Sequence, residues 1–198
     1  TNIIKSVFGY SIPTWINAFI GILAVPLVTR LFEPDVLGKF NLFYMYSTIL
    51  YSISLTGLNQ GVMRFYVNPP GKNSAGGLFK LSFIVVLVFS LIVSIFVVIF
   101  GKTFSEAIVG EFNIYVLICL VISIFTAASL NMINSVYRMQ NMLLVYGVLT
   151  VLMNLSSKIT FAGAVFFNNK FNGAIIIFTL SYLVIAIIFI IKILYQYN

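Results

Sequence analysis

The sequence contains few charged residues and no histidine. Its eleven Lys and Arg and four Asp and Glu amount to 8% of 198 residues, about a third of the share in a typical soluble domain. Without histidine, the chain lacks the side chain that most often serves as a general base or metal ligand. Its one cysteine, Cys119, forms no internal disulfide. These absences exclude an ordinary soluble domain and a histidine-dependent enzyme.

Acidic residues are the scarcest charged type, and all of them fall between apolar stretches. They are Glu33, Asp35, Glu106 and Glu111. Because no pair of carboxylates lies inside an apolar stretch, we expect no enzymatic acid–base chemistry and no bound metal or cofactor. The net charge of +7 comes from basic residues scattered between the stretches. Membrane orientation explains that pattern better than a nucleic-acid partner does.

Long apolar stretches are what the sequence has in abundance. Hydrophobic residues make up 61% of the chain, and six stretches are long enough to cross a hydrocarbon core of about 30 Å as helices. We place these spans at residues 6–31, 38–60, 79–100, 113–137, 141–167 and 172–194. The pattern predicts an all-α, polytopic membrane protein whose residues 1–198 form one six-helix transmembrane bundle. The first stretch is too long for a signal-peptide core, so we expect it to be a span.

The basic residues between the spans predict the orientation of the chain. One side receives Lys5, Arg64, Lys72, Lys80, Arg138 and Lys192 and no acid; the other receives Arg30, Lys39, Lys102, Lys170 and all four acids. Because cytoplasmic loops carry an excess of Lys and Arg, we expect both termini in the cytoplasm. The loop at residues 68–73 is rich in turn-forming residues and predicts a break between the second and third spans.

Four of the six spans carry polar side chains on one helical face. The candidates for a shared cavity are Thr14 and Asn17, Tyr44 and Thr48, Asn131 and Asn134, and Asn154 beside Lys158. Single polar residues also hydrogen-bond one membrane helix to another. Because four helices carry such a polar face, the pattern favours a shared hydrated cavity over four separate helix–helix contacts. The third and sixth spans, by contrast, carry only a few hydroxyls among aliphatic residues at 81–100 and 174–191, a composition with which a helix can face lipid all round.

Lys158 is the only charged residue deep within an apolar stretch. A charge at this depth costs about 2.5–3.5 kcal/mol on insertion scales. Its long stem could instead lift the ammonium to the outer interface, but about 13–14 Å of helix separates it from the end of the span. We therefore predict that Lys158 attracts an anion, such as a phosphate or an acidic sugar.

Two prolines and two arginines have both structural and functional interpretations. Pro13 and Pro26 interrupt the first span, either as hinges for a conformational change or as static kinks. Arg64 and Arg138 fall at predicted cytoplasmic helix ends, where they orient the chain and contact lipid phosphates or a pyrophosphate head group.

The stretch from residue 17 to residue 66 resembles the opening of bacterial polysaccharide flippases. These are the O-antigen and capsule repeat-unit translocases of the multidrug/oligosaccharidyl-lipid/polysaccharide exporter superfamily. The shared pattern is a span ending in Arg30, a short loop with Pro34, Asp35 and Gly38, and a second span that ends near a glycine, Gly57 or Gly61, and Arg64. The similarity covers about the first third of the chain closely, and the remainder in span number.

The resemblance implies a transporter of two six-helix lobes, of which this chain is the N-terminal one. It implies alternating access that moves undecaprenyl-pyrophosphate-linked oligosaccharide across the bacterial inner membrane for lipopolysaccharide or capsule biosynthesis. The implied partners are the lipid-linked oligosaccharide, membrane lipids, and a polysaccharide polymerase with other assembly proteins. Lys158 matches, by type and depth, the cationic residues expected in the lumen of such a transporter.

Other functions stay open at this point. A peptidoglycan-precursor flippase carries a closely related substrate. A drug/cation antiporter of the same superfamily often uses an acid within the membrane, whereas this chain has Asn17 at a mid-span polar position. A membrane-embedded transferase or phosphatase needs acids that hold Mg²⁺ or activate a nucleophile. A scaffold subunit without a substrate of its own needs neither the polar faces nor Lys158.

Overall fold

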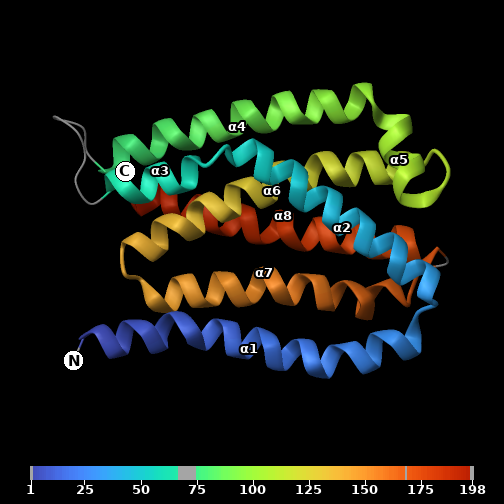
Figure 1. Ribbon diagram of the computed structural model, residues 1–198, viewed down its shortest axis with the longest axis horizontal. Helices are drawn as coiled ribbons and strands as arrows, with labels where there is room; N and C mark the ends of the chain where they lie inside the picture. Colours follow the sequence, from blue (N-terminus) through green and yellow to red (C-terminus); the bar gives the residue numbers. More distant parts are fainter. Residues whose placement is uncertain (1, 67–74, 168, 197–198) are drawn as a thin grey trace.

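The computed structural model describes residues 2–66, 75–167 and 169–196, and within them the secondary structure is helical. The helices are α1 (Asn2–Leu31), α2 (Pro34–Leu55), α3 (Leu58–Tyr66), α4 (Ala75–Ile99), α5 (Gly101–Val109), α6 (Ile114–Met139), α7 (Leu143–Ala164) and α8 (Lys170–Gln196). The long helices lie along one common direction, which is horizontal in Figure 1. The predicted turn at residues 68–73 lies outside the described residues.

Five of these helices are long and apolar enough to cross a membrane: α1 from Gly9, α4 from Gly76, and α6, α7 and α8. Large apolar side chains also cover the outside of the bundle, among them Trp15, 60% exposed, and Phe19, 63% exposed. Such a surface belongs in hydrocarbon rather than in water. The prediction of an all-α, multi-pass membrane protein is therefore confirmed.

The predicted second span, residues 38–60, is not one continuous helix. α2 ends at Leu55, and Thr56 and Gly57 adopt left-handed backbone angles with φ of 45° and 73°. α3 then begins at Leu58 and continues toward the same end of the bundle (Figure 1). Because α2 contains more polar residues, it is not counted among the five helices that are apolar enough to cross a membrane. The prediction of six continuous spans is thus wrong in this pass, and it also missed the short helix α5.

Helix α8 does not face lipid all round, although its composition would allow it. It packs against both α6 and α7, and its Ala174 and Ile175 are fully buried. α4 likewise buries Val86 and Ser90 on the side that meets α2 and α6. Side chains in a membrane protein meet equally apolar surroundings in lipid and in a helix interface, so composition alone does not reveal packing.

Helix α1 lies at the edge of the bundle and packs mainly on α7. Pro13 is buried against Gly147, where an added Cβ would lie 3.1 Å from the proline Cγ. The Tyr10 hydroxyl donates to the Arg138 carbonyl over 2.9 Å. α1 continues as a helix through Pro13 and Pro26, and the hinge role of the two prolines stays a prediction.

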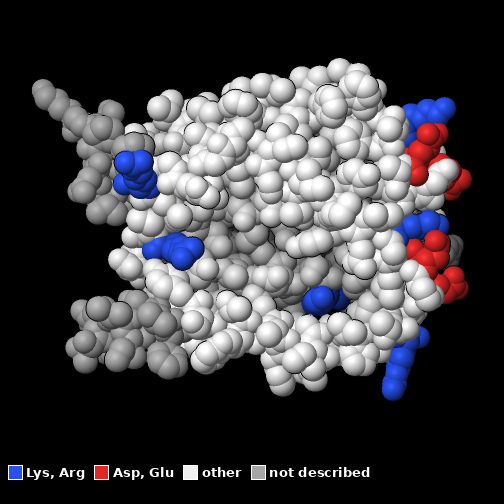
Figure 2. Space-filling model, viewed as in Figure 1, with Lys and Arg blue, Asp and Glu red and all other residues white. Residues whose placement is uncertain are grey.

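Apart from Lys158, the charged side chains that the structure describes lie toward the two ends of the bundle. In Figure 2 the acidic side chains gather at one end only, whereas basic side chains are visible at both. Both termini lie at the end opposite the acids (Figures 1 and 2). The face between α1 and α2, which we call the hollow face, is depressed in its middle (Figure 2).

Candidate functional site

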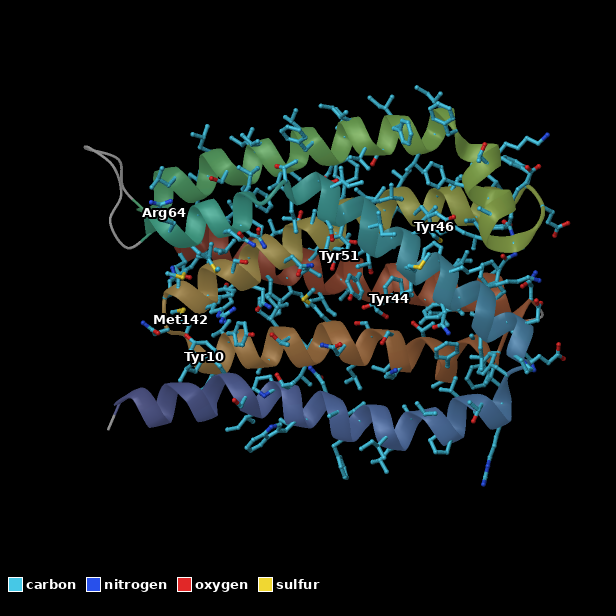
Figure 3. The ribbon with its side chains drawn as sticks, in the orientation of Figure 1. Tyr10, Tyr44, Tyr46, Tyr51, Arg64 and Met142 are labelled. Atoms are coloured by element: carbon cyan, nitrogen blue, oxygen red, sulfur yellow. The ribbon has the colours of Figure 1, made fainter. Side chains whose placement is uncertain are left out.

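A cavity of about 200 Å³ lies among α2, α6, α7 and α8. Its wall is formed by Tyr44, Ser47, Thr48, Tyr51, Ala127, Asn131, Asn134, Thr150, Met153, Asn154, Phe178 and Tyr182. We call it the central cavity. The labelled side chains of Tyr44 and Tyr51 lie where the hollow face is depressed (Figures 2 and 3). Hydroxyl and amide groups thus line a recess in an otherwise apolar bundle.

Three of the four predicted polar faces meet at this cavity. Tyr44, Thr48, Asn131, Asn134 and Asn154 line it together, as the helical spacing predicts. Because α2, α6 and α7 turn their polar faces inward, side chains more than a hundred residues apart share one recess.

The polar face of α1 does not join the central cavity. Neither Thr14 nor Asn17 lines it, so the prediction of a cavity built by four spans is wrong for α1. Thr14 is exposed, and the Asn17 Oδ1 atom is buried without a hydrogen-bond partner among the described residues. The physical reason is the position of α1, which packs mainly on α7 at the edge of the bundle.

The aromatic residues of α8 are the part of the cavity that the sequence does not predict. Phe178 lies at the centre of an aromatic cluster, with ring centroids 4.6 Å from Tyr182 and 5.8 Å from Tyr44. In Figure 3, Tyr44 lies on the side of α2 toward α7, whereas Tyr46 lies on the side toward α5. The single tyrosine in the apolar run of α8 was the available signal, and it was too weak to outweigh the aliphatic residues around it.

The three asparagines of the cavity have well-defined orientations. The Nδ2 atoms of Asn131 and Asn154 each donate to a backbone carbonyl of their own helix over 2.9 Å. The Asn134 Nδ2 donates over 3.2 Å to Thr150 Oγ1, which in turn donates to the Tyr146 carbonyl. Because a carbonyl oxygen only accepts hydrogen bonds, the amide nitrogens are held on these sides.

Lys158 lines a second cavity, of about 230 Å³, between α1, α2 and α7. Thr29, Asn41 and Phe161 share its wall. In the described part of the chain Lys158 has no ion-pair partner, since the lysines of the two ion pairs are Lys39 and Lys102. Lys158 is half-buried, so its side chain belongs to a recess of the bundle.

Helices α2 and α7 both contribute to the walls of the two cavities. On α7, Lys158 lies one helical turn beyond Asn154; on α2, Asn41 lies one turn before Tyr44. We call these residues, with Thr48 and Thr150, the polar track. It leads from hydroxyl and amide groups to an ammonium group.

The remaining predicted residues lie outside both cavities. Arg64 and Arg138 are exposed near the end of the bundle that holds the termini, and the Arg138 guanidinium lies 5.6 Å from the centre of the Tyr10 ring.

The residues of the family pattern form the corner between α1 and α2. Arg30 is in the last turn of α1, Pro34 is the first residue of α2, and Gly38 is exposed on α2. Pro34 suits its position because the first helical residue needs no backbone N–H. Arg30, Pro34 and Gly38 line neither cavity, although their chain neighbours Thr29 and Leu37 belong to the wall of the Lys158 cavity.

Comparison with known proteins adds no relative. No protein-family model, no curated protein and no solved structure matches the chain. The resemblance of residues 17–66 to polysaccharide flippases therefore stays a prediction from the sequence.

Proposed function

We propose that this chain is one lobe of a transporter that moves undecaprenyl-pyrophosphate-linked oligosaccharide repeat units across the bacterial inner membrane by alternating access. The observation that carries the proposal is the polar track, which ends at Lys158 and runs along the hollow face of an otherwise apolar bundle. Its physical basis is the high cost of bringing sugars and phosphates into hydrocarbon. A polar recess lowers that cost.

The parts of such a substrate correspond to different surfaces of the bundle. The central cavity offers polar groups for sugar, and Lys158 offers a cation without a competing acid in either cavity. A third cavity, of about 530 Å³, lies between α1 and α7, and the described residues that line it are apolar. It suits part of a polyprenyl chain, which stays in contact with lipid while the polar head group crosses.

Alternating access requires a second lobe against the hollow face and elements that move. The polar track is open on that face rather than enclosed by the bundle. α1, with its two prolines, packs mainly on α7, and the break after α2 lets α3 change direction. In this proposal both termini lie in the cytoplasm, and a polysaccharide polymerase and other assembly proteins receive the product on the outer side.

The drug/cation antiporter is the less favoured function. A cationic drug in the polar track would be repelled by Lys158, and neither cavity contains an acid to attract it. An anionic lipid-linked substrate has the opposite, favourable interaction.

Transport by a Lys158→Gln variant tests this proposal. In proteoliposomes loaded with a fluorescent polyprenyl-diphosphate oligosaccharide, we expect the rate of transbilayer movement to fall about tenfold or more, because a charge-assisted contact contributes roughly 1.5–3 kcal/mol. Lys102→Gln is the matched control, since Lys102 is an exposed lysine outside both cavities. A Lys158→Gln variant that transports as fast as the wild type would contradict the proposal.

A further inference from the structure

The serine and threonine hydroxyls of the central cavity donate their protons to groups within the bundle. Thr48 Oγ1 donates to the Tyr44 carbonyl over 2.8 Å, and Thr150 Oγ1 donates to its own helix over the same distance. Ser47 Oγ donates to Ser123 Oγ, also over 2.8 Å. A hydroxyl whose proton is used in this way still has a lone pair that can accept a hydrogen bond.

The amide groups of the cavity also use a hydrogen-bond donor within the bundle. Asn131, Asn134 and Asn154 each donate one hydrogen bond from Nδ2 to a neighbouring carbonyl or hydroxyl. The Asn134 Oδ1 is buried and has no hydrogen-bond partner among the described residues. The hydroxyls of Tyr44, Tyr51 and Tyr182 and the second N–H of each amide can donate, so the wall of the central cavity offers both acceptors and donors.

A wall of neutral donors and acceptors favours a ligand that both donates and accepts hydrogen bonds. A phosphate is negatively charged and presents only acceptors, so it is better placed one helical turn away, at the Lys158 ammonium. A small cation is disfavoured by the same lysine and by the lack of an acid in the cavity wall. A sugar ring instead carries several hydroxyl donors, and its C–H face packs on aromatic rings such as Tyr44, Phe178 and Tyr182.

We infer that the central cavity is a glycosyl subsite, which holds one sugar ring of the substrate while the Lys158 cavity holds its phosphate. A cavity of about 200 Å³ suits a single ring rather than a whole repeat unit. The inference rests on the proposed function. It specifies that the central cavity recognises the sugar and that Lys158 recognises the negative charge.

Two probes separate the two subsites in a binding measurement. The protein is reconstituted in lipid nanodiscs and titrated with a short-chain polyprenyl diphosphate, and separately with the same lipid carrying one N-acetylhexosamine ring. We expect Thr48→Val, which preserves the shape of the side chain, to weaken binding of the sugar-bearing probe about three- to tenfold and to leave the bare diphosphate unchanged. Lys158→Gln is expected to weaken both probes.

A second variant and a matched control keep the result interpretable. Asn154→Leu alters an exposed position and is expected to show the same selectivity as Thr48→Val. Thr103→Val makes the same substitution on α5, outside both cavities, and is expected to leave both affinities unchanged. Cavity variants that weaken both probes equally, or neither, would overturn the glycosyl subsite alone. A wild-type protein that binds neither probe would overturn the proposed function as well.

Discussion

At the scale of single residues, the structure distinguishes polar groups that hydrogen-bond to another helix from those that hydrogen-bond to their own helix, and both kinds occur in the wall of the central cavity. Ser47 Oγ donates to Ser123 Oγ across the α2–α6 interface, and both residues are buried. Asn131 and Asn154 instead bond to their own helices and face the central cavity. The sequence does not distinguish the two kinds of polar group, because each is a small polar side chain in an apolar run.

The Ser47 hydrogen bond predicts a small, measurable loss of stability. Ser47→Ala removes the donor to Ser123, and we expect the free energy of unfolding to fall by about 0.6–1.7 kcal/mol, the range for hydrogen bonds between membrane helices. Reversible unfolding in mixed micelles with SDS measures it. Ser135→Ala is the control, because its hydroxyl bonds only to its own helix. Equal losses in the two variants would contradict an interhelical role for Ser47.

At the scale of helices, the break between α2 and α3 is the main departure from the expected pattern. Gly57 has a φ of 73° and faces open space, with no atom within 4 Å of an added Cβ. The pair Gly57 and Gly61 therefore marks a helix boundary rather than a tight helix contact. A broken helix frees backbone groups, which are tolerated in a membrane protein where protein or water satisfies them.

Substitution of the two glycines tests the break. Gly57→Ala places a side chain on a left-handed residue, and we expect a loss of about 1–2 kcal/mol in the free energy of unfolding. Gly61→Ala lies within α3 with no atom within 4 Å of its Cβ position, so we expect a gain of about 0.5–1 kcal/mol. The same micelle titration measures both. A stabilising Gly57→Ala would indicate that α2 and α3 form one continuous helix.

At the scale of the whole molecule, the charge distribution and the path of the chain agree. All four acids belong to the segments around the α1–α2 corner and around α5, at the end of the bundle opposite the termini. Of the described basic residues near the ends, Arg64, Lys80, Arg138 and Lys192 lie near the terminal end with no acid among them. With Lys5 and Lys72, which the sequence adds to this side, the basic residues number six against the four at the other end (Arg30, Lys39, Lys102 and Lys170), and this count is the basis of the predicted cytoplasmic orientation.

Cysteine labelling tests this orientation. Cys119 is 4% exposed, so the unmodified chain gives little background. We expect a membrane-impermeant maleimide to label Lys102→Cys in right-side-out inner-membrane vesicles and Asn141→Cys only after the vesicles are opened. Lys102 is exposed on α5, which precedes α6, whereas Asn141 is exposed in the turn that follows the opposite end of α6. The reverse pattern would place the termini outside and would contradict the proposed orientation.

The sequence by itself determined the membrane character, most of the helices, and the residues of the polar faces on α2, α6 and α7. These properties depend on composition and on helical periodicity, which are local. Only the tertiary structure decided that α8 contributes Phe178 and Tyr182 to the central cavity, that α1 stays outside it, and that Lys158 lines a separate cavity beside α1. The reason is physical: lipid tails and apolar helix faces are alike as surroundings, so a helix sequence records how apolar its neighbours are but not which neighbours they are.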